Sequence, residues 1–356
     1  LRQVAFDDSA GILSFRYIAE PWSHWLAIDD ETVDPEDEDS VEDYLYRLEQ
    51  RGNERAQATI SSGFHDERGR LRYRSTDAPW CHGTAGCAVF TVNPDPDIHD
   101  PFYPMNKAFL EWNDAARETY LLTGLDGEYV DSYLGQAMEL DLRRSHFAAV
   151  DTPLTFATRN RRVGIPQVFA TTEFARWLTD EVHDDLGKWT MANGMLLDLP
   201  WGADLFDFLG TETDWLRGGQ FTPETDARLS YRRTLAYRKP YGMLMNTDFD
   251  AFGADLVERY IQISLFYALY PSARGNVLTL MENPQHPHPA LHYSVCGNYI
   301  DIHVNLTPEV ERVVMLQDGG VFRDGPKAEL LTGDAITELY GVPAEVEERD
   351  GWYRLW

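Results

Sequence analysis

The middle of the chain alternates between short apolar runs and longer stretches with helical spacing, and each apolar run ends abruptly on polar residues. Four runs carry this pattern most clearly: Gly124–Tyr133 (GLDGEYVDSY), Gly187–Gly194 (GKWTMANG), Asp207–Trp215 (DFLGTETDW) and Tyr241–Asp250 (YGMLMNTDFD). A near-continuous apolar run is typical of a parallel strand that is buried on both faces. The residues that end these runs would lie at the carboxyl ends of the strands, where ligands bind in α/β folds. These residues are Asp131, Asn193, Glu212, Asn246 and Asp248.

The same reasoning, applied to the whole chain, predicts about eight strands separated by helices. Strands are predicted at Gly11–Tyr17, Ala56–Gly63, Cys87–Asn93, Asp126–Asp131, Lys188–Ala192, Phe206–Thr211, Met243–Met245 and within Gly275–Met281. Helices are predicted at Val41–Gln50, Phe109–Leu122, Thr171–Leu186, Pro223–Tyr237 and Gly253–Tyr270. This alternation predicts an α/β protein with a (β/α)8 TIM-like barrel over residues 1–300. A doubly wound sheet is the alternative, and the sequence leaves open whether the barrel is complete.

The pattern changes after about residue 300. Two short apolar runs flank Gln317-Asp318-Gly319-Gly320, which is a hairpin turn signal. A short helix at Lys327–Tyr340 and a strand-like tail at Ala344–Trp356 follow. We expect residues 301–356 to form a small separate α+β unit.

The charge of the chain is unusual and limits its partners. The formal net charge is −28, and lysine occurs only at 107, 188, 239 and 327. An acid-rich, lysine-poor surface is typical of proteins from extreme halophiles, whose concentrated salt screens the mutual repulsion. An acidic protein from a mesophile is the alternative. In either case nucleic acid and anionic membranes are not expected as partners, because they require a basic face.

Cysteines and apolar segments add little further. Cys81, Cys87 and Cys296 are odd in number and lack C-x-x-C spacing, so we expect neither a disulfide framework nor a zinc site. No apolar run reaches the roughly 18–20 residues of a membrane span. No signal-peptide pattern is present, which favours a cytoplasmic protein, although the chain lacks an initial methionine and this weakens the inference.

Carboxylates and amides gathered at one rim of a parallel barrel favour sugar chemistry. Glycosidic cleavage requires one carboxylate at the anomeric carbon and a second carboxyl group that protonates the leaving oxygen. We assign Asp131 as nucleophile or base and Glu212 as acid/base, with Asp248 as an alternative acid or sugar ligand. Asn193 and Asn246 offer amides for sugar hydroxyls. Carboxylates at strand ends also cap helices or pair with arginine. Each of these residues, taken alone, could therefore have a structural role as readily as a catalytic one.

Other residues at the predicted rim are weaker candidates for the binding of substrate. Trp22, Trp25 and Trp215 could pack on the C–H faces of sugars, and Arg16 follows the first strand. Packing within loops is the alternative for each tryptophan. Glu128 differs in strand parity from Asp131, so we expect it to face the helices. His286, His288 and His292 are separated by prolines, and a solvated loop is favoured over a metal site.

No cofactor is expected. The sequence contains neither G-x-G-x-x-G nor G-x-x-x-x-G-K-[ST], so it has no phosphate-binding loop, and it has no G-x-S-x-G element.

Residues 11–272 resemble a group of prokaryotic proteins with glycoside-hydrolase-like (β/α)8 barrels. The resemblance is carried by GILSFRYIAEPWSHW, DGEYVDSYL, IPQVFATTEFARWL, KWTMANG, GTETDW, YRRTLAYRKPYGMLMNTDFD and VERYIQISLFYALYPS. The DG-x-Y-x-D element also resembles the nucleophile element of other retaining glycosidases, which implies that role for Asp131. The resemblance implies a carbohydrate substrate but does not fix which one.

Residues 303–356, with ERVVMLQDGGVFRDGPKAELLTGDAITELYGVPAEVE, are similar to the C-terminal end of ABC-transporter ATPase subunits. His303 falls near the switch histidine of that family. The phosphate loop and signature motif are missing, so ATPase activity is not expected. Three hypotheses follow: a glycosidase, a non-catalytic carbohydrate-binding barrel, and a truncated or fused ABC-related protein.

Overall fold

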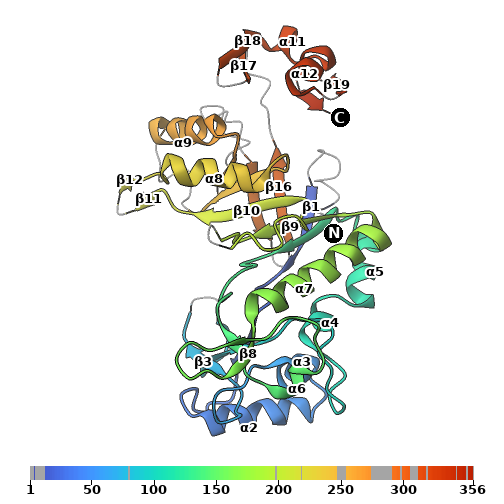
Figure 1. Ribbon diagram of the computed structural model, residues 1–356, viewed down its shortest axis with the longest axis vertical. Coiled ribbons are helices and arrows are strands. Elements are labelled where there is room, and N and C mark those ends of the chain that lie inside the picture. The colour runs from blue at the N-terminus through green and yellow to red at the C-terminus, as the bar shows by residue number, and fades with distance from the viewer. Residues whose placement is uncertain are drawn as a thin grey trace. The chain divides into compact units, whose positions relative to one another are not determined.

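The computed structural model describes a mixed α/β protein (Figure 1). The described residues are 4, 13–78, 81–196, 199–217, 219–246, 254–273, 291–296, 299–304, 312–317, 320–341, 343–349 and 352–355. The chain divides into two compact units. The first contains residues 1–212, 224–242 and 295–301, and the second contains residues 213–223, 243–294 and 302–356. Each unit is described by itself.

A six-stranded parallel sheet is the central feature. Its strands, in order, are β1 (Leu13–Ile18), β5 (Gly127–Val130), β9 (Trp189–Asn193), β10 (Phe208–Thr213), β13 (Tyr241–Met245) and β14 (Tyr270–Ala273). The register of the first four is continuous, since Tyr17 lies opposite Tyr129, Tyr129 opposite Met191, and Met191 opposite Phe208. Two further strands, β15 (Leu291–Cys296) and β16 (Tyr299–Val304), follow in the chain. The described residues do not establish a closed eight-stranded barrel.

The sheet is strongly curved, and its two faces differ. The ring centroids of Phe15 on β1 and Phe208 on β10 are 5.8 Å apart, although three strand spacings in a flat sheet would separate them by about 14 Å. We call the concave side, which carries Phe15, Tyr17, Asp131 and Asn193, the inner face. Gly127 permits this contact, because a Cβ atom there would collide with the Phe15 ring.

Helices cover the outer face. In the first unit they are α4 (Lys107–Glu111), α5 (Asp114–Thr123), α7 (Gln167–Asp180), which continues into the π-helical turn η1 (Glu181–Asp185), and α8 (Asp226–Ala236). In the second unit, α9 (Ala254–Phe266) packs beside β14. The helix predicted at Phe109–Leu122 is in fact two, because the Asn113 side chain accepts from Ala116 N–H and starts α5 anew. Helix α7 begins before the predicted Thr171, directly after Pro166.

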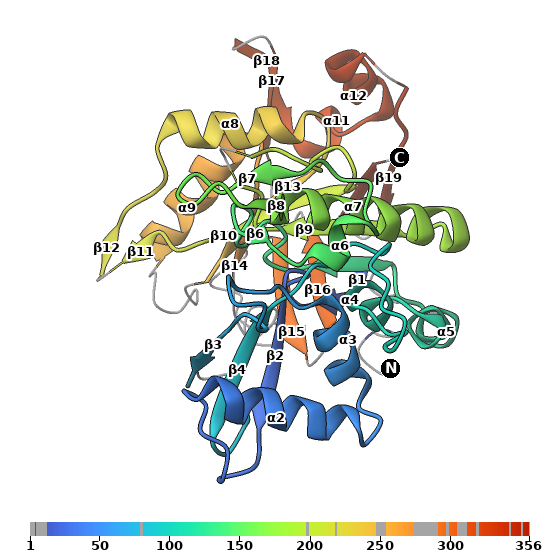
Figure 2. The same cartoon turned by 60° about the horizontal axis from the view of Figure 1, so that its bottom comes forward.

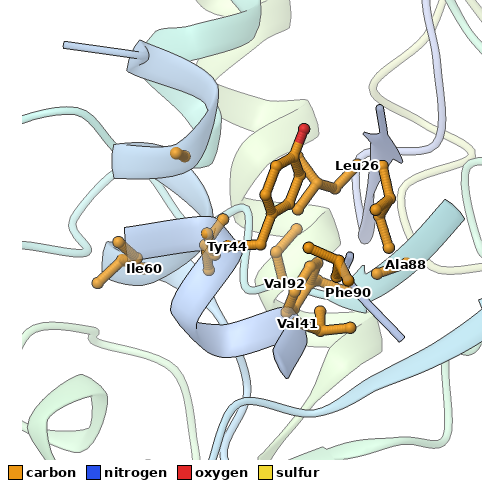
Figure 3. Close-up of a cluster of buried hydrophobic side chains, with 11 residues drawn as sticks. Leu26, Val41, Tyr44, Ile60, Ala88, Phe90 and Val92 are labelled. Atoms are coloured by element: carbon orange, nitrogen blue, oxygen red, sulfur yellow. The ribbon is translucent and has the colours of Figure 1, made fainter. Parts of the chain in front are cut away.

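A small α+β layer is inserted between β1 and β5 (Figure 2). It contains the antiparallel strands β2 (Ser23–Ile28), β3 (Tyr73–Thr76) and β4 (Gly86–Thr91), with helices α2 (Glu38–Glu49) and α3 (Glu54–Ser62). Figure 3 shows Val41 and Tyr44 of α2 packed with Leu26, Ala88 and Phe90 of the strands. The layer therefore has its own apolar core.

Two strand predictions fail in this layer. Ala56–Gly63 is the helix α3, whose start is fixed by the Asn53 side chain accepting from Ala56 N–H. The predicted strand at Cys87–Asn93 exists as β4, but it pairs antiparallel with β2 and β3 and is not part of the parallel sheet. A further correction concerns the cysteines, because Cys81 and Cys87 form a disulfide with their Cα atoms 5.9 Å apart. The loop that turns back into β4 brings them together, which their spacing did not reveal.

The remaining elements are short. Before α7 lie β6 (Leu140–Asp141), α6 (Arg144–Phe147), β7 (Thr155–Phe156) and β8 (Val163–Pro166), and after β10 lie β11 (Leu216–Arg217) and β12 (Gln220–Phe221). The C-terminal segment has the predicted hairpin, β17 (Arg312–Gln317) and β18 (Gly320–Pro326), then α11 (Lys327–Leu330), α12 (Gly333–Tyr340) and a second hairpin, β19 (Val346–Arg349) and β20 (Trp352–Leu355). Among the described residues, no helix has both the length and the apolar character needed to cross a bilayer.

Candidate active site

Asp131 lies at the carboxyl end of β5 and receives three hydrogen bonds. The Tyr17 hydroxyl donates to its Oδ2 over 2.5 Å, and the Asn193 amide donates to its Oδ1 over 2.6 Å. The backbone N–H of Ser132 donates to Oδ1 over 2.8 Å. Three neighbouring strand ends thus converge on one carboxylate, as parallel register requires of residues with matching parity.

The turn after Asp131 is tightly constrained. Ser132 has a φ of 47°, a left-handed conformation that non-glycine residues rarely adopt. The Trp22 indole N–H donates to Ser132 O over 2.7 Å, and Tyr133 N–H donates to Asn193 O over 2.8 Å. Gly194, with a φ of +85°, packs directly against the Ser132 backbone. Strained backbone of this kind persists where its surroundings fix it, and it is common at functional sites.

Glu212 is connected to the same cluster through Asn193. Asn193 Oδ1 accepts the backbone N–H of Glu212 over 3.1 Å, so both ends of this buried amide are used. In the register, Gly210 lies opposite Asn193, which places Glu212 on the inner face with Asp131 by parity. Its side chain is exposed, and a substrate could therefore reach it.

The pKa of Tyr17 depends on its burial and on the carboxylates that lie near Asp131. Burial raises the pKa of Tyr17 far above its usual value, and the negative charges of Asp131, Glu20 and Glu212 raise it further. Only charges close to the phenol have such an effect, because interactions between charges weaken with distance and with solvent screening. Asp131 contacts the hydroxyl directly, and Glu20 and Glu212 lie near enough for their charges to raise its pKa further.

Two candidates belong to the second unit, and one lies outside the described residues. Asn246 is exposed and its backbone N–H donates to Thr213 O over 2.9 Å. Trp215 is 1% exposed and packs edge-on against Tyr260, so it is a core residue and offers no surface to a sugar. Asp248 lies outside the described residues.

Arg16 does not face the candidate site. It alternates with Tyr17 along β1, and it donates to Glu128 Oε1 over 2.6 Å on the outer face. Glu128 is fully buried and also accepts from the Tyr120 hydroxyl of α5 over 2.5 Å. Arg16 additionally donates to Glu111 O over 2.7 Å. The expectation that Glu128 faces the helices is confirmed, and Arg16 serves a buried ion pair.

The loop tryptophans near the rim also have structural partners. Trp22 is 6% exposed, with its ring against Gly135. Trp25 donates to Glu20 Oε2 over 3.0 Å, and the Arg74 guanidinium lies 5.8 Å from its ring centroid. Trp22 therefore supports the Ser132 turn, and only Trp25, half-buried, retains a surface that a ligand could touch.

Tyr17 was not among the site residues predicted from the sequence, because an aromatic residue inside an apolar run is usually a core residue. The signal available in the sequence was its alternation with Arg16 along the strand, which places the two side chains on opposite faces of the sheet. Glu20, which follows β1, accepts a hydrogen bond from the Ser23 hydroxyl. Within the described part of the chain, no group of three or more histidine, cysteine, aspartate or glutamate side chains could hold a metal ion.

Comparison with known proteins gives no relative. No protein-family model, no curated protein and no solved structure matches the chain. The resemblances noted above therefore rest on the quoted sequence segments alone.

Proposed function

We propose that the chain is a glycoside hydrolase that cleaves O-glycosidic bonds with Asp131 and Glu212. The single observation that carries the proposal is the hydrogen-bonded series Asp131–Asn193–Glu212 across three neighbouring strand ends of the inner face. Two carboxyl groups on one concave rim are what glycosidic cleavage requires.

The surroundings of the two acids support different roles. Among the described residues, three groups donate hydrogen bonds to Asp131 and none accepts one from it, which suits a carboxylate acting as nucleophile or base. Glu212 is exposed at the rim, where it could protonate a leaving oxygen and then exchange its proton with water. Asn193 binds the carboxylate of Asp131 and the backbone N–H of Glu212, and it takes a positioning role.

The spacing of the strands is compatible with this chemistry. The backbones of β5 and β10 are two strand spacings apart, about 10 Å, and side chains on a concave face converge. The two side chains can therefore bring their carboxyl groups to the distance that glycosidases use, which is about 5–5.5 Å in retaining enzymes and about 6.5–9.5 Å in inverting ones. The parallel sheet with helices on its outer face also suits the (β/α)8 barrel that we propose as the complete architecture.

Hydrolysis of a panel of aryl glycosides and polysaccharides, in low and high salt, tests the proposal. Asp131→Asn and Glu212→Gln should each lower turnover at least 100-fold, while binding of the sugar persists. Glu128→Gln is the matched control, because it neutralises a carboxylate of the same strand that faces the helices. Its turnover per folded molecule should stay within about twofold of the parent.

Other outcomes point to the other hypotheses. Saturable sugar binding without turnover in the parent chain would indicate a carbohydrate-binding protein. Nucleotide binding measured by calorimetry would favour the ABC-related hypothesis. Unchanged turnover in both Asp131→Asn and Glu212→Gln would overturn the proposed function.

A further inference from the structure

We infer that Tyr17 is a positioning residue that fixes Asp131 and leaves Asp131 Oδ2 as its reacting atom. The inference rests on the proposed function and assigns a role to a residue that the carboxylate pair does not require. It follows from the distribution of donors over the two oxygens of Asp131 and from the rigidity of the Tyr17 ring.

The two oxygens of Asp131 are not equivalent. A carboxylate offers about four lone-pair sites, two on each oxygen. Oδ1 receives both the Asn193 amide at 2.6 Å and the Ser132 N–H at 2.8 Å, so its two sites are occupied. From the described residues, Oδ2 receives only the Tyr17 hydroxyl at 2.5 Å. One lone pair of Oδ2 therefore remains for an incoming atom.

The Tyr17 ring is itself held in place. It stacks on Tyr129 of β5 with centroids 5.7 Å apart and an interplanar angle of 18°. The two residues face each other in the register of β1 and β5. Because both strands belong to the sheet, the hydroxyl is aimed at Asp131 by the fold and not by a mobile loop. This pre-organisation distinguishes a positioning residue from a fortuitous contact.

The reaction can then be written with Tyr17 as a spectator that keeps its proton. Oδ2 of Asp131 forms a bond to the anomeric carbon while the bond from that carbon to the leaving oxygen breaks. The electron pair of the broken bond stays on the leaving oxygen, which takes the proton of Glu212. Water, deprotonated by Glu212, later displaces Asp131 from the anomeric carbon. If the enzyme inverts, Oδ2 instead removes the proton from the attacking water. The strongly raised pKa of Tyr17, caused first by burial and then by the charge of Asp131, is consistent with a phenol that stays protonated throughout.

The pH dependence of kcat/KM in Tyr17→Phe tests this role. The variant keeps the ring and its stacking but loses one of three donors to the carboxylate. The acidic limb of the profile should move to higher pH by about one unit, since the remaining donors stabilise the charge less. The value of kcat/KM on the plateau of the profile should fall about 10-fold, and the change should lie more in kcat than in KM.

Tyr120→Phe is the matched control. It removes the same kind of bond, from a tyrosine hydroxyl to the carboxylate of Glu128, on the opposite face of β5. It should lower thermal stability without moving the acidic limb. If Tyr17→Phe leaves the limb in place, or if Tyr120→Phe moves it equally, the role of Tyr17 is refuted.

A second readout does not depend on turnover. In protein labelled with carbon-13 at the tyrosine Cζ, the Tyr17 resonance is identified by its loss in Tyr17→Phe. Its chemical shift at neutral pH should change in Asp131→Asn, because the hydroxyl no longer donates to a charged carboxylate. An unchanged chemical shift would overturn the inference even if Asp131→Asn abolishes hydrolysis. A parent chain without hydrolysis would defeat the proposed function, and this chemical shift would still decide whether Tyr17 holds Asp131.

Discussion

Replacement of Arg16 by methionine tests the assignment of this residue to a buried ion pair. Methionine keeps most of the apolar stem of arginine but removes the guanidinium that contacts Glu128 Oε1 at 2.6 Å. Glu128 is fully buried, and its other oxygen has no hydrogen-bond partner within the part of the chain that the structure describes. Breaking a buried pair by removing one partner typically costs about 3–5 kcal/mol, because an uncompensated charge remains.

The loss of stability in Arg16→Met should be larger at high pH than at low pH. Burial raises the pKa of Glu128 from 4.5 to about 7, although Arg16 and Tyr120 act against this shift. A raised carboxyl pKa means that the folded state binds the proton more tightly, so stability is lost as the pH rises from 4.5 through 7. Without Arg16 the pKa rises further, and each added unit costs about 1.4 kcal/mol at pH values above it. At pH 5.5 Glu128 is protonated in both the parent and Arg16→Met, so the loss in free energy of unfolding should shrink to about 1–2 kcal/mol.

Urea unfolding followed by tryptophan fluorescence at pH 5.5 and pH 8.5 measures both losses. The double variant Arg16→Met/Glu128→Gln should recover at least half of the loss at pH 8.5, because no charge is left buried. Folded Arg16→Met should retain any hydrolysis that the parent shows in the test of the proposed function, since Arg16 lies on the outer face. Equal losses at the two pH values, or a selective loss of sugar binding with normal stability, would refute the reasoning.

Three further predictions concern other parts of the chain. Burial raises the pKa of Asp95 from 3.8 to about 7, so Asp95→Asn should stabilise the fold by about 2–4 kcal/mol at pH 8.5 and by less than half of that at pH 5; a melting temperature lowered at pH 8.5 would contradict this. The net charge of −28 predicts a melting temperature that rises steeply with potassium chloride up to about 1 M, where the screening length falls to about 3 Å; a flat response in calorimetry would contradict it. The Cys81–Cys87 disulfide uses two of the three cysteines, so thiol titration of the denatured, unreduced chain should find at most one thiol per molecule, and three would count against the bond.

Strong local patterns predicted much of the parallel sheet. The apolar runs at β9, β10 and β13 and the broad apolar face of α9 were located within a few residues, because burial on both faces of a strand leaves a clear signal. The segment 56–63 was mistaken for a strand, since a short run of small and apolar residues does not distinguish strand from helix. The deciding signal was Asn53, which caps the helix.

The candidate site was predicted in part for similar reasons. Asp131 and Asn193 follow apolar runs, and parallel register brings them together. Arg16 was assigned to the rim without regard to strand parity, which instead directs Tyr17 to the inner face. Trp22 was a weaker candidate for a sugar platform, with loop packing as the alternative; its indole binds the strained turn at Ser132, and such long-range contacts leave no mark in local sequence.

The dependence of hydrolysis on the leaving group is the most direct test of two carboxyl groups acting on one glycosidic bond. Aryl glycosides with leaving groups of graded acidity are compared in the parent, Asp131→Asn and Glu212→Gln. If Glu212 protonates the leaving oxygen, Glu212→Gln should hydrolyse the most acidic leaving groups nearly as fast as the parent and the least acidic ones at least 100-fold more slowly. Asp131→Asn should be slow on all of them. A uniform loss in Glu212→Gln, or full activity in Asp131→Asn, would contradict the account.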